Sequence, residues 1–246
     1  MGANLDVVMP RSQNNVLLLA ARNGDIDLLK LLLEEGVDVN SVNAGNTNAL
    51  MTAISYQHDA AAKLLIDVGK NIKHSNRTGM TALHYAAGFD RKGNIAKLLI
   101  SKGAITEVLD DIESEPIITA ASYGNNTIID ILLANGVSLA KFDQSKTFTP
   151  LMAAAANNKP DTVEYFLKKN ARIDSQDKMG RTAIIWAARY GCVDCVRQLI
   201  DKGGKLDLRD NRGLTAVDHA KQEPKNQQII QLLERAMAKL HRTTRR

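Results

Sequence analysis

The chain has 246 residues, 44% of them hydrophobic, and a formal net charge of +5. No apolar run approaches the roughly 20 residues that a membrane-spanning helix needs, and residues 1–10 lack the basic and apolar segments of a signal peptide. These features argue against a membrane-spanning or secreted protein and predict a cytoplasmic one, although a removed targeting segment would leave the same sequence.

Residues 1–14 stand outside the pattern that fills the rest of the chain, and we expect them to form a cap or a loose flank. From residue 15 to 235 a short pattern recurs at intervals of 33 or 34 residues. The seven units begin near Asn15, Asn48, Thr81, Glu115, Thr149, Thr182 and Thr215. Such a period indicates stacked supersecondary units, each too small to bury its own apolar face. The repeats predict one continuous stack without an internal domain boundary.

Each unit is expected to contain two helices. The first follows a residue such as Asn48 or Thr81, whose side chain can cap the free amides of a first turn. It carries paired small residues, such as Ala86 and Ala87, that we expect to face the interior of the stack. The second carries an apolar triplet and ends at a residue suited to a left-handed helix end. These stop residues are Gly36, Gly69, Gly103, Gly136, Asn170 and Gly203.

A tight turn follows each stop residue after a short extended stretch. In the turn Asn211-Arg212-Gly213, for example, glycine supplies the positive φ. The turns ending at Ser114 and Phe148 lack that glycine, which argues against regular hairpin geometry at these two places. One extra residue within 89–93 predicts a bulged loop in the third unit.

The repeated unit resembles the ankyrin repeat. Residues 81–87 (Thr-Ala-Leu-His-Tyr-Ala-Ala) and 182–188 (Thr-Ala-Ile-Ile-Trp-Ala-Ala) are similar to the family signature Thr-Pro-Leu-His-x-Ala-Ala, although both lack the proline. The resemblance implies an all-α repeat solenoid, an ankyrin-repeat stack of helix–turn–helix units with projecting β-turn or hairpin fingers. It also implies protein binding along the concave face, built from the fingers and the first helices, and a turn-ordering role for His84.

Residues that could support catalysis or bind a metal form no recognisable motif. The sequence has no glycine-rich phosphate loop, nucleophile elbow or zinc-protease signature, and its five histidines fall at different repeat positions. Cys192 and Cys195 have the spacing of a redox or half-zinc motif, but we expect packed structural residues at the start of a second helix. The acidic run at 110–115 is expected to be a solvated turn. We therefore predict a protein that is not an enzyme and has no cofactor and no metal.

Basic residues concentrate near the C-terminus. Eleven basic and six acidic residues lie between 200 and 246, so this region accounts for the whole net charge. The basic tail at 236–246 could bind nucleic acid or an anionic surface, which is the alternative to protein binding. A solvated helix end explains such charges more often. Polar residues of the last unit favour a monomer; they are Gln227, Gln228 and Gln231.

Aromatic residues are placed selectively. Two positions of the first helix, four residues apart, share one face because i and i+4 are neighbours on a helix. Six of the ten aromatic residues occupy these two columns: Tyr56, Tyr85, Phe89, Tyr123, Trp186 and Tyr190. The predicted groove also contains Arg22, Phe148, Met179, Arg181 and Arg189.

Such a groove suits a partner protein, because tyrosine, tryptophan and arginine are enriched at binding hot spots. We predict that it receives a peptide or helix with apolar anchors and acidic flanks. The alternative is that the rings only pack against neighbouring turns, and this applies above all to Tyr85 and Trp186. The sequence thus favours a non-enzymatic adaptor or regulator whose partner it does not identify.

Overall fold

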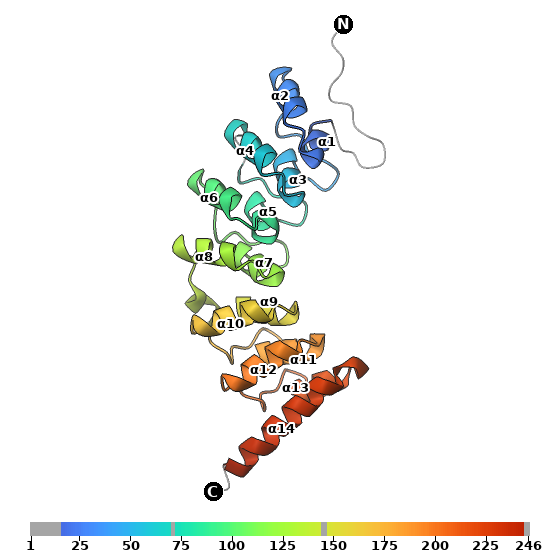
Figure 1. Cartoon of the computed structure of the whole chain (residues 1–246), viewed down its shortest axis with the longest axis vertical. Coiled ribbons are helices and arrows are strands. Elements are labelled where there is room, and N and C mark those ends of the chain that lie inside the picture. The colour runs from blue at the N-terminus through green and yellow to red at the C-terminus, as the bar shows by residue number, and fades with distance from the viewer. Residues whose placement is uncertain (1–15, 70–71, 144–146, 244–246) are drawn as a thin grey trace. The chain divides into compact units, whose positions relative to one another are not determined.

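The computed structural model describes residues 16–69, 72–143 and 147–243, and within them α-helices follow one another in pairs (Figure 1). The first helices of the pairs are α1 (Val16–Asn23), α3 (Ala49–Ser55), α5 (Ala82–Phe89), α7 (Pro116–Tyr123), α9 (Pro150–Ala156), α11 (Ala183–Tyr190) and α13 (Ala216–Lys221). The second helices are α2 (Ile26–Glu34), α4 (Asp59–Val68), α6 (Asn94–Ser101), α8 (Asn126–Ala134), α10 (Pro160–Lys168), α12 (Val193–Asp201) and α14 (Gln227–Thr243). The connections contain two 3-10 helices, η1 (Leu139–Asp143) and η2 (Pro224–Asn226).

The described residues contain isolated β-bridges, Val42 with Asn48 and Ser75 with Thr81, but no β-strand. Each bridge closes the base of a turn that joins one helix pair to the next, and we call these turns fingers. The predicted all-α repeat of helix–turn–helix units is therefore confirmed.

The chain divides into two compact units. The first comprises the described residues up to 120 together with 127–137, and the second comprises 121–126 and the described residues from 138 onward. In the first unit, α1, α3 and α5 pack in one row, and α2, α4 and α6 in another (Figure 1). In the second, α9, α11 and α13 form one row, and α10, α12 and α14 the other (Figure 1).

Side-chain caps start the first helices as the sequence predicts. The Asn48 side chain accepts a hydrogen bond from the Met51 amide at 2.9 Å, and Thr149 Oγ1 accepts one from the Met152 amide at 3.1 Å. Each cap satisfies an amide that the helix itself leaves unpaired, which stabilises the helix by about 1 kcal/mol.

The interior of each unit combines small and branched side chains. The paired alanines of the first helices, among them Ala86 and Ala87, are fully buried, as predicted. Leu65 and Leu99, from second helices, pack in the same interior. Small side chains allow neighbouring helices to approach closely, and the leucines supply the apolar area whose burial stabilises the stack.

The helix ends follow the prediction with one exception. Gly36, Gly103, Gly136 and Gly203 take positive φ between 80° and 95°, and Asn170 has a φ of 58°. Gly69 instead has a φ of −84° and a ψ of 136°, so the predicted left-handed end is wrong there. A Cβ at Gly69 would lie 2.6 Å from the Leu65 carbonyl oxygen, so this position requires glycine for lack of space rather than for its φ.

The finger at 110–114 is regular although it lacks glycine, so the irregularity expected there is wrong. Glu113 takes the positive φ of 60° that glycine has elsewhere. The Asp110 amide donates to the Ser114 carbonyl at 3.0 Å, and Asp110 Oδ1 accepts from the Ser114 amide at 2.8 Å. At the second such turn, residues 144–146 lie outside the described part of the chain.

The loop at 89–93 accommodates its extra residue around one buried carboxylate. Asp90 Oδ1 accepts from the Gly93 amide at 2.8 Å, and its Oδ2 accepts from the Ala96 amide at 2.9 Å. The bulge expected from the sequence is thus an ordered turn in which Asp90 holds the start of α6.

Candidate functional site

The six aromatic residues of the two predicted columns differ in exposure by column. Three of the four rings at the ends of first helices are exposed: Tyr56 is 50%, Tyr123 43% and Tyr190 50% exposed. Nearer the helix starts, Tyr85 and Trp186 are half-buried, and so is Phe89 in the outer column. The outer column therefore offers most of the aromatic surface that a ligand could reach.

In the first unit, two predicted residues contact each other. The Arg22 guanidinium lies 5.2 Å from the centre of the Tyr56 ring, within the range of a cation–π contact. Tyr85 is used differently, because its hydroxyl accepts a hydrogen bond from Asn76 Nδ2 at 3.0 Å. Tyr85 thereby joins α5 to the finger that precedes it.

In the second unit, five predicted residues form one continuous set of contacts, which we call the aromatic cluster: Phe148, Arg181, Trp186, Arg189 and Tyr190. The ring of Trp186 stacks on that of Tyr190 at 5.6 Å with an angle of 5° between the planes. Phe148 meets Trp186 edge to face at 5.2 Å. The Arg181 guanidinium lies 4.0 Å from the Trp186 ring centre, and that of Arg189 lies 5.8 Å from the Tyr190 ring centre.

Two further predicted residues of this unit are exposed. Met179, at the tip of the 177–181 finger, is 48% exposed, and Tyr123 ends α7. The structure thus places the eleven predicted residues in both units and joins five of them, Trp186 included, in the aromatic cluster.

Asp177 organises the aromatic cluster, and the sequence analysis missed it. Its Oδ1 accepts from the amides of Met179 at 2.8 Å and Arg181 at 2.9 Å. Its Oδ2 accepts from Arg181 Nε at 2.9 Å and from Trp186 Nε1 at 3.1 Å. One side chain, only 5% exposed, therefore fixes the turn, the arginine and the ring.

A signal for this residue exists in the sequence. Each described finger begins with Asn or Asp five residues before the helix-capping position: Asn43, Asn76, Asp110, Asp177 and Asp210. In three repeats the same side chain also bonds the residue nine positions later: Asn76 with Tyr85, Asp177 with Trp186, and Asp210 with His219. The turn glycines mark only the positive-φ position, so they do not reveal this second pattern at the start of the finger.

Among the histidines whose burial is described, His84 and His219 are buried, and both hold fingers in place. His84 Nδ1 lies 3.1 Å from the Thr81 amide, and its Nε2 lies 3.0 Å from the Ser114 carbonyl oxygen, which matches the turn-ordering role implied by the resemblance. Burial lowers the pKa of His84, although the bond to Ser114 acts in the opposite direction. His219 Nε2 lies 2.8 Å from Asp210 Oδ2.

Asp210 stays ionised in this buried setting. Burial alone would raise the pKa of Asp210, but hydrogen bonds from the Leu214 amide, from His219 and from the Arg212 amide hold it below the usual range. Its carboxylate is therefore occupied in holding its finger to α13, as the Asp177 carboxylate holds the preceding finger to α11. Neither forms a nucleophile–base pair of the kind that catalysis requires.

Cys192 and Cys195 are fully buried at the start of α12, as expected for packed residues. The structure also joins them in a disulfide, which the sequence analysis did not anticipate. Among the described residues, no group of three or more His, Cys, Asp and Glu side chains could hold a metal ion.

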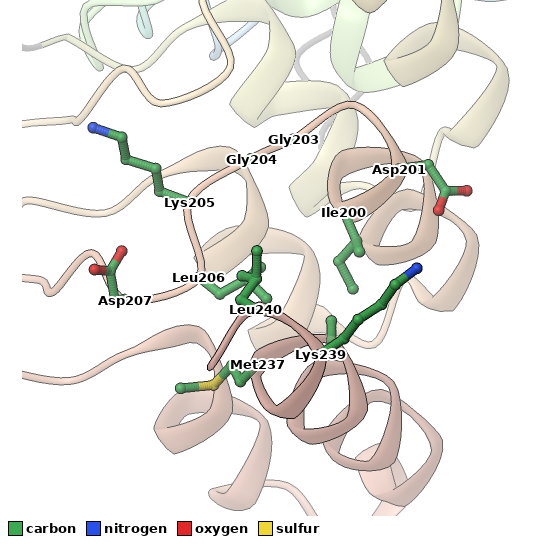
Figure 2. Close-up of a pocket in the computed structure, with 11 residues that line it drawn as sticks. Ile200, Asp201, Gly203, Gly204, Lys205, Leu206, Asp207, Met237, Lys239 and Leu240 are labelled. Atoms are coloured by element: carbon green, nitrogen blue, oxygen red, sulfur yellow. The ribbon is translucent and has the colours of Figure 1, made fainter. Parts of the chain in front are cut away.

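A separate cleft of roughly 710 Å³ lies at the C-terminal end of the second unit, between the last turns of α14 and the segment that follows α12 (Figure 2). Aliphatic side chains line it: Ile200, Leu206, Met237 and Leu240. The charged residues at its rim are Asp201, Lys205, Asp207 and Lys239. Two acidic and two basic side chains give this cleft no preference for a ligand of either sign.

The basic segment at 236–246 continues α14 as far as Thr243. Its side chains from residue 241 onward lie outside the described part, so the predicted anionic-surface contact remains a prediction. No helix within the described residues is long and apolar enough to cross a membrane.

Nearly the whole repeat region is similar to known ankyrin-repeat proteins. A family model described as "Ankyrin repeats (3 copies)" matches residues 17–110, 91–177 and 151–243. The ankyrin repeat domain of human ASB11, known from a crystal structure, is similar with a TM-score of 0.76 and 29% sequence identity. The similarity covers 91% of this chain and 98% of that domain.

Several longer proteins contain a similar segment. The Transient receptor potential cation channel subfamily A member 1 homolog of Caenorhabditis elegans is 30% identical over 179 residues, 72% of this chain and 14% of that protein. L-asparaginase of Dirofilaria immitis is 31% identical over 156 residues, 63% of this chain and 26% of that protein. Neurogenic locus notch homolog protein 1 of Xenopus tropicalis is 30% identical over 142 residues, 56% of this chain and 6% of that protein. The chain thus spans at most 26% of these relatives.

Proposed function

This chain belongs to the ankyrin-repeat family, and from that premise we propose that it is a non-enzymatic adaptor or regulator that docks a partner protein on the aromatic cluster. Repeats of this family serve as protein–protein interaction modules. Binding would act by occupancy, either by masking a surface of the partner or by bringing two partners together.

The observation that carries this proposal is the stack of Tyr190 on Trp186, flanked by Arg181 and Arg189. Tyr190 is half exposed although it sits on a ring that is itself fixed by hydrogen bonding. A rigid aromatic surface loses little conformational entropy on binding, and aromatic and arginine residues contribute most at protein interfaces. The two arginines favour a partner with acidic groups beside its apolar anchor.

The test is capture of partners from a lysate on the immobilised chain, with Tyr123→Ala/Tyr190→Ala as the variant. These two rings are exposed and outside the Asp177 network, so the variant should keep its fold, which circular dichroism would check. A protein retained by the native chain and lost from the variant would be purified and its affinity measured directly by calorimetry.

Matched variants distinguish binding at the aromatic cluster from binding elsewhere on the chain. Tyr56→Ala removes an equally exposed tyrosine from the first unit, and Leu240→Gln changes the aliphatic cleft (Figure 2). Deletion of residues 239–246 removes the basic end, where binding of nucleic acid or an anionic surface would depend strongly on salt. Loss of the captured protein with one of these variants, and not with the tyrosine pair, would contradict the proposal.

A further inference from the structure

Arg181 is held in one orientation by contacts within its own repeat. Its Nε donates to Asp177 Oδ2 at 2.9 Å, and its guanidinium carbon lies 4.0 Å from the ring centre of Trp186. Because Trp186 Nε1 donates to that same oxygen at 3.1 Å, one buried carboxylate fixes the arginine and the ring together. The Arg181 side chain nevertheless keeps 21% of its surface exposed, so its position is ordered and accessible at once.

Among the described residues, these contacts use Nε and one face of the Arg181 guanidinium, which leaves the two terminal amino groups for an external ligand. A guanidinium presents its N–H groups in a planar fork that matches both oxygens of a carboxylate. Since the fork is already ordered, a ligand need not immobilise the side chain, and more of the interaction energy appears as affinity.

Charges around Arg181 also favour an anionic ligand. The 177–181 and 210–214 fingers are adjacent, because Asn211 donates to the Met179 carbonyl at 2.9 Å and to the Lys178 carbonyl at 3.0 Å. Basic residues on these fingers and on α11 are Lys178, Arg181, Arg189 and Arg212. The acidic residues of the same fingers are Asp177 and Asp210, both buried, so the accessible charge is positive.

A cationic ligand does not suit the same surface. Recognition of an ammonium group needs an open aromatic face, but Arg181 already lies over the ring of Trp186. The guanidinium of Arg189 lies 5.8 Å from the ring centre of Tyr190. A lysine or arginine of the partner would meet two positive charges before it reached either ring.

We infer that the aromatic cluster recognises an aspartate or glutamate side chain of the partner, with the carboxylate bound by Arg181 and an adjacent apolar side chain against Tyr190. This inference rests on the proposed function and adds to it the chemistry of the bound segment. Asp177 is the positioning residue, because it touches Arg181 and Trp186 and is itself buried.

Labelled synthetic peptides with a central leucine test the inference, the flanking residues being glutamate, glutamine or lysine. Binding to the full chain is followed by fluorescence anisotropy, and by the emission of Trp186, which is the only tryptophan of the chain. We expect the glutamate peptide to bind about tenfold more tightly than the glutamine peptide, as a charge-assisted hydrogen-bonded pair would give. The lysine peptide should bind most weakly.

Arg181→Gln is the decisive variant, because glutamine can still donate to Asp177 but carries no charge. It should abolish the preference for glutamate over glutamine, and Arg181→Lys should restore it only in part because lysine lacks the planar fork. Arg22→Gln is the matched control: Arg22 also lies beside a half-exposed tyrosine, but in the first unit. This control should leave the preference unchanged.

The outcomes separate the inference from the proposed function. Equal binding of the glutamate and glutamine peptides, no binding of any peptide, or an unchanged preference in Arg181→Gln would overturn carboxylate recognition. A captured protein lost from Tyr123→Ala/Tyr190→Ala but retained by Arg181→Gln would also overturn it, while protein docking on the cluster would stand. If capture of the protein were unaffected both by Tyr123→Ala/Tyr190→Ala and by Arg181→Gln, carboxylate recognition and protein docking on the cluster would both be wrong.

Discussion

Asn76 and Asp177 begin equivalent fingers in the two units, and each accepts two amide hydrogen bonds that close the turn. Asn76 also donates to the Tyr85 hydroxyl, whereas Asp177 accepts from Trp186 Nε1 and from Arg181 Nε. An amide can donate and accept, so it satisfies a tyrosine, but a carboxylate only accepts and therefore selects donors. The residue that begins a finger thus decides which helix side chain it holds.

The surfaces of the two units differ accordingly. In the first unit, the 110–114 finger exposes Asp111 and Glu113 around Ile112, which is 83% exposed. In the second unit, buried Asp177 and Asp210 lie beneath exposed Lys178 and Arg212. The same backbone pattern carries an acidic finger in one unit and basic fingers in the other, because the turn geometry constrains only the first residue and the positive-φ position.

The largest predicted effect comes from exchanging the two finger residues. Asp177→Asn should destabilise the second unit by about 2 kcal/mol, because an amide nitrogen or a weaker acceptor would face two partly buried donors, one of them charged. Asn76→Asp should cost less than about 1 kcal/mol, because the Tyr85 hydroxyl can donate to the new carboxylate. Urea unfolding followed by Trp186 fluorescence measures the second unit, and circular dichroism the whole chain. Equal losses of stability in both variants would contradict the idea that the first residue of a finger selects the helix side chain that it holds.

The disulfide offers the next contrast, since the chain's two cysteines both lie in the second unit. Reduction should lower the stability of that unit by at most about 2 kcal/mol, because the bond closes a very short loop. Trp186 fluorescence in urea with and without reductant measures the change, and Cys192→Ser/Cys195→Ser serves as the control insensitive to reductant. A larger loss, or a shift in that control, would argue against this account.

On the binding surface, Tyr190→Ala should weaken partner binding about tenfold, whereas Tyr56→Ala should leave it unchanged. The two tyrosines are equally exposed and both lie beside an arginine, so they differ chiefly in the stack on Trp186. Calorimetry with the captured protein gives the two affinities. If Tyr56→Ala weakened binding as much, exposure rather than the aromatic cluster would govern docking.

Acid should affect the two units in different pH ranges. The folded state lowers the pKa of His84 from 6.5, so the stability that neutral His84 gives the first unit is present above pH 6.5 and decreases as the pH falls below it. The lowered pKa of Asp210 means that its contribution to the second unit is lost only below pH 3.8. Hydrogen exchange at pH 7 and pH 5, expressed as protection factors to remove the intrinsic pH dependence of amide exchange, should show lower protection near α5 at pH 5, with His84→Gln as the insensitive control. A loss of protection at pH 5 that is confined to α13 would contradict the assignment of this pH dependence to His84.

The repeat period, the capping residues, the small paired residues and most helix ends could be predicted from the sequence. These features depend on contacts within one repeat or between neighbours, where backbone preference and apolar burial act at fixed spacing. The left-handed end predicted at Gly69 was wrong because glycine serves there to avoid the Leu65 carbonyl. The irregular turn predicted before Ser114 was wrong because Glu113 takes the positive φ that glycine has elsewhere.

The sequence by itself also determined which columns hold the aromatic residues, because a helix places i and i+4 on one face. Only the tertiary structure decided that Trp186 is fixed by Asp177 and that Tyr190 remains exposed above it. Side-chain hydrogen bonding between a finger and the following helix depends on distances of about 3 Å, which residue spacing cannot specify. The spacing before Thr182 marks Asp177 as the first residue of its finger, but its role in the cluster comes from the two donors that folding brings to one buried oxygen.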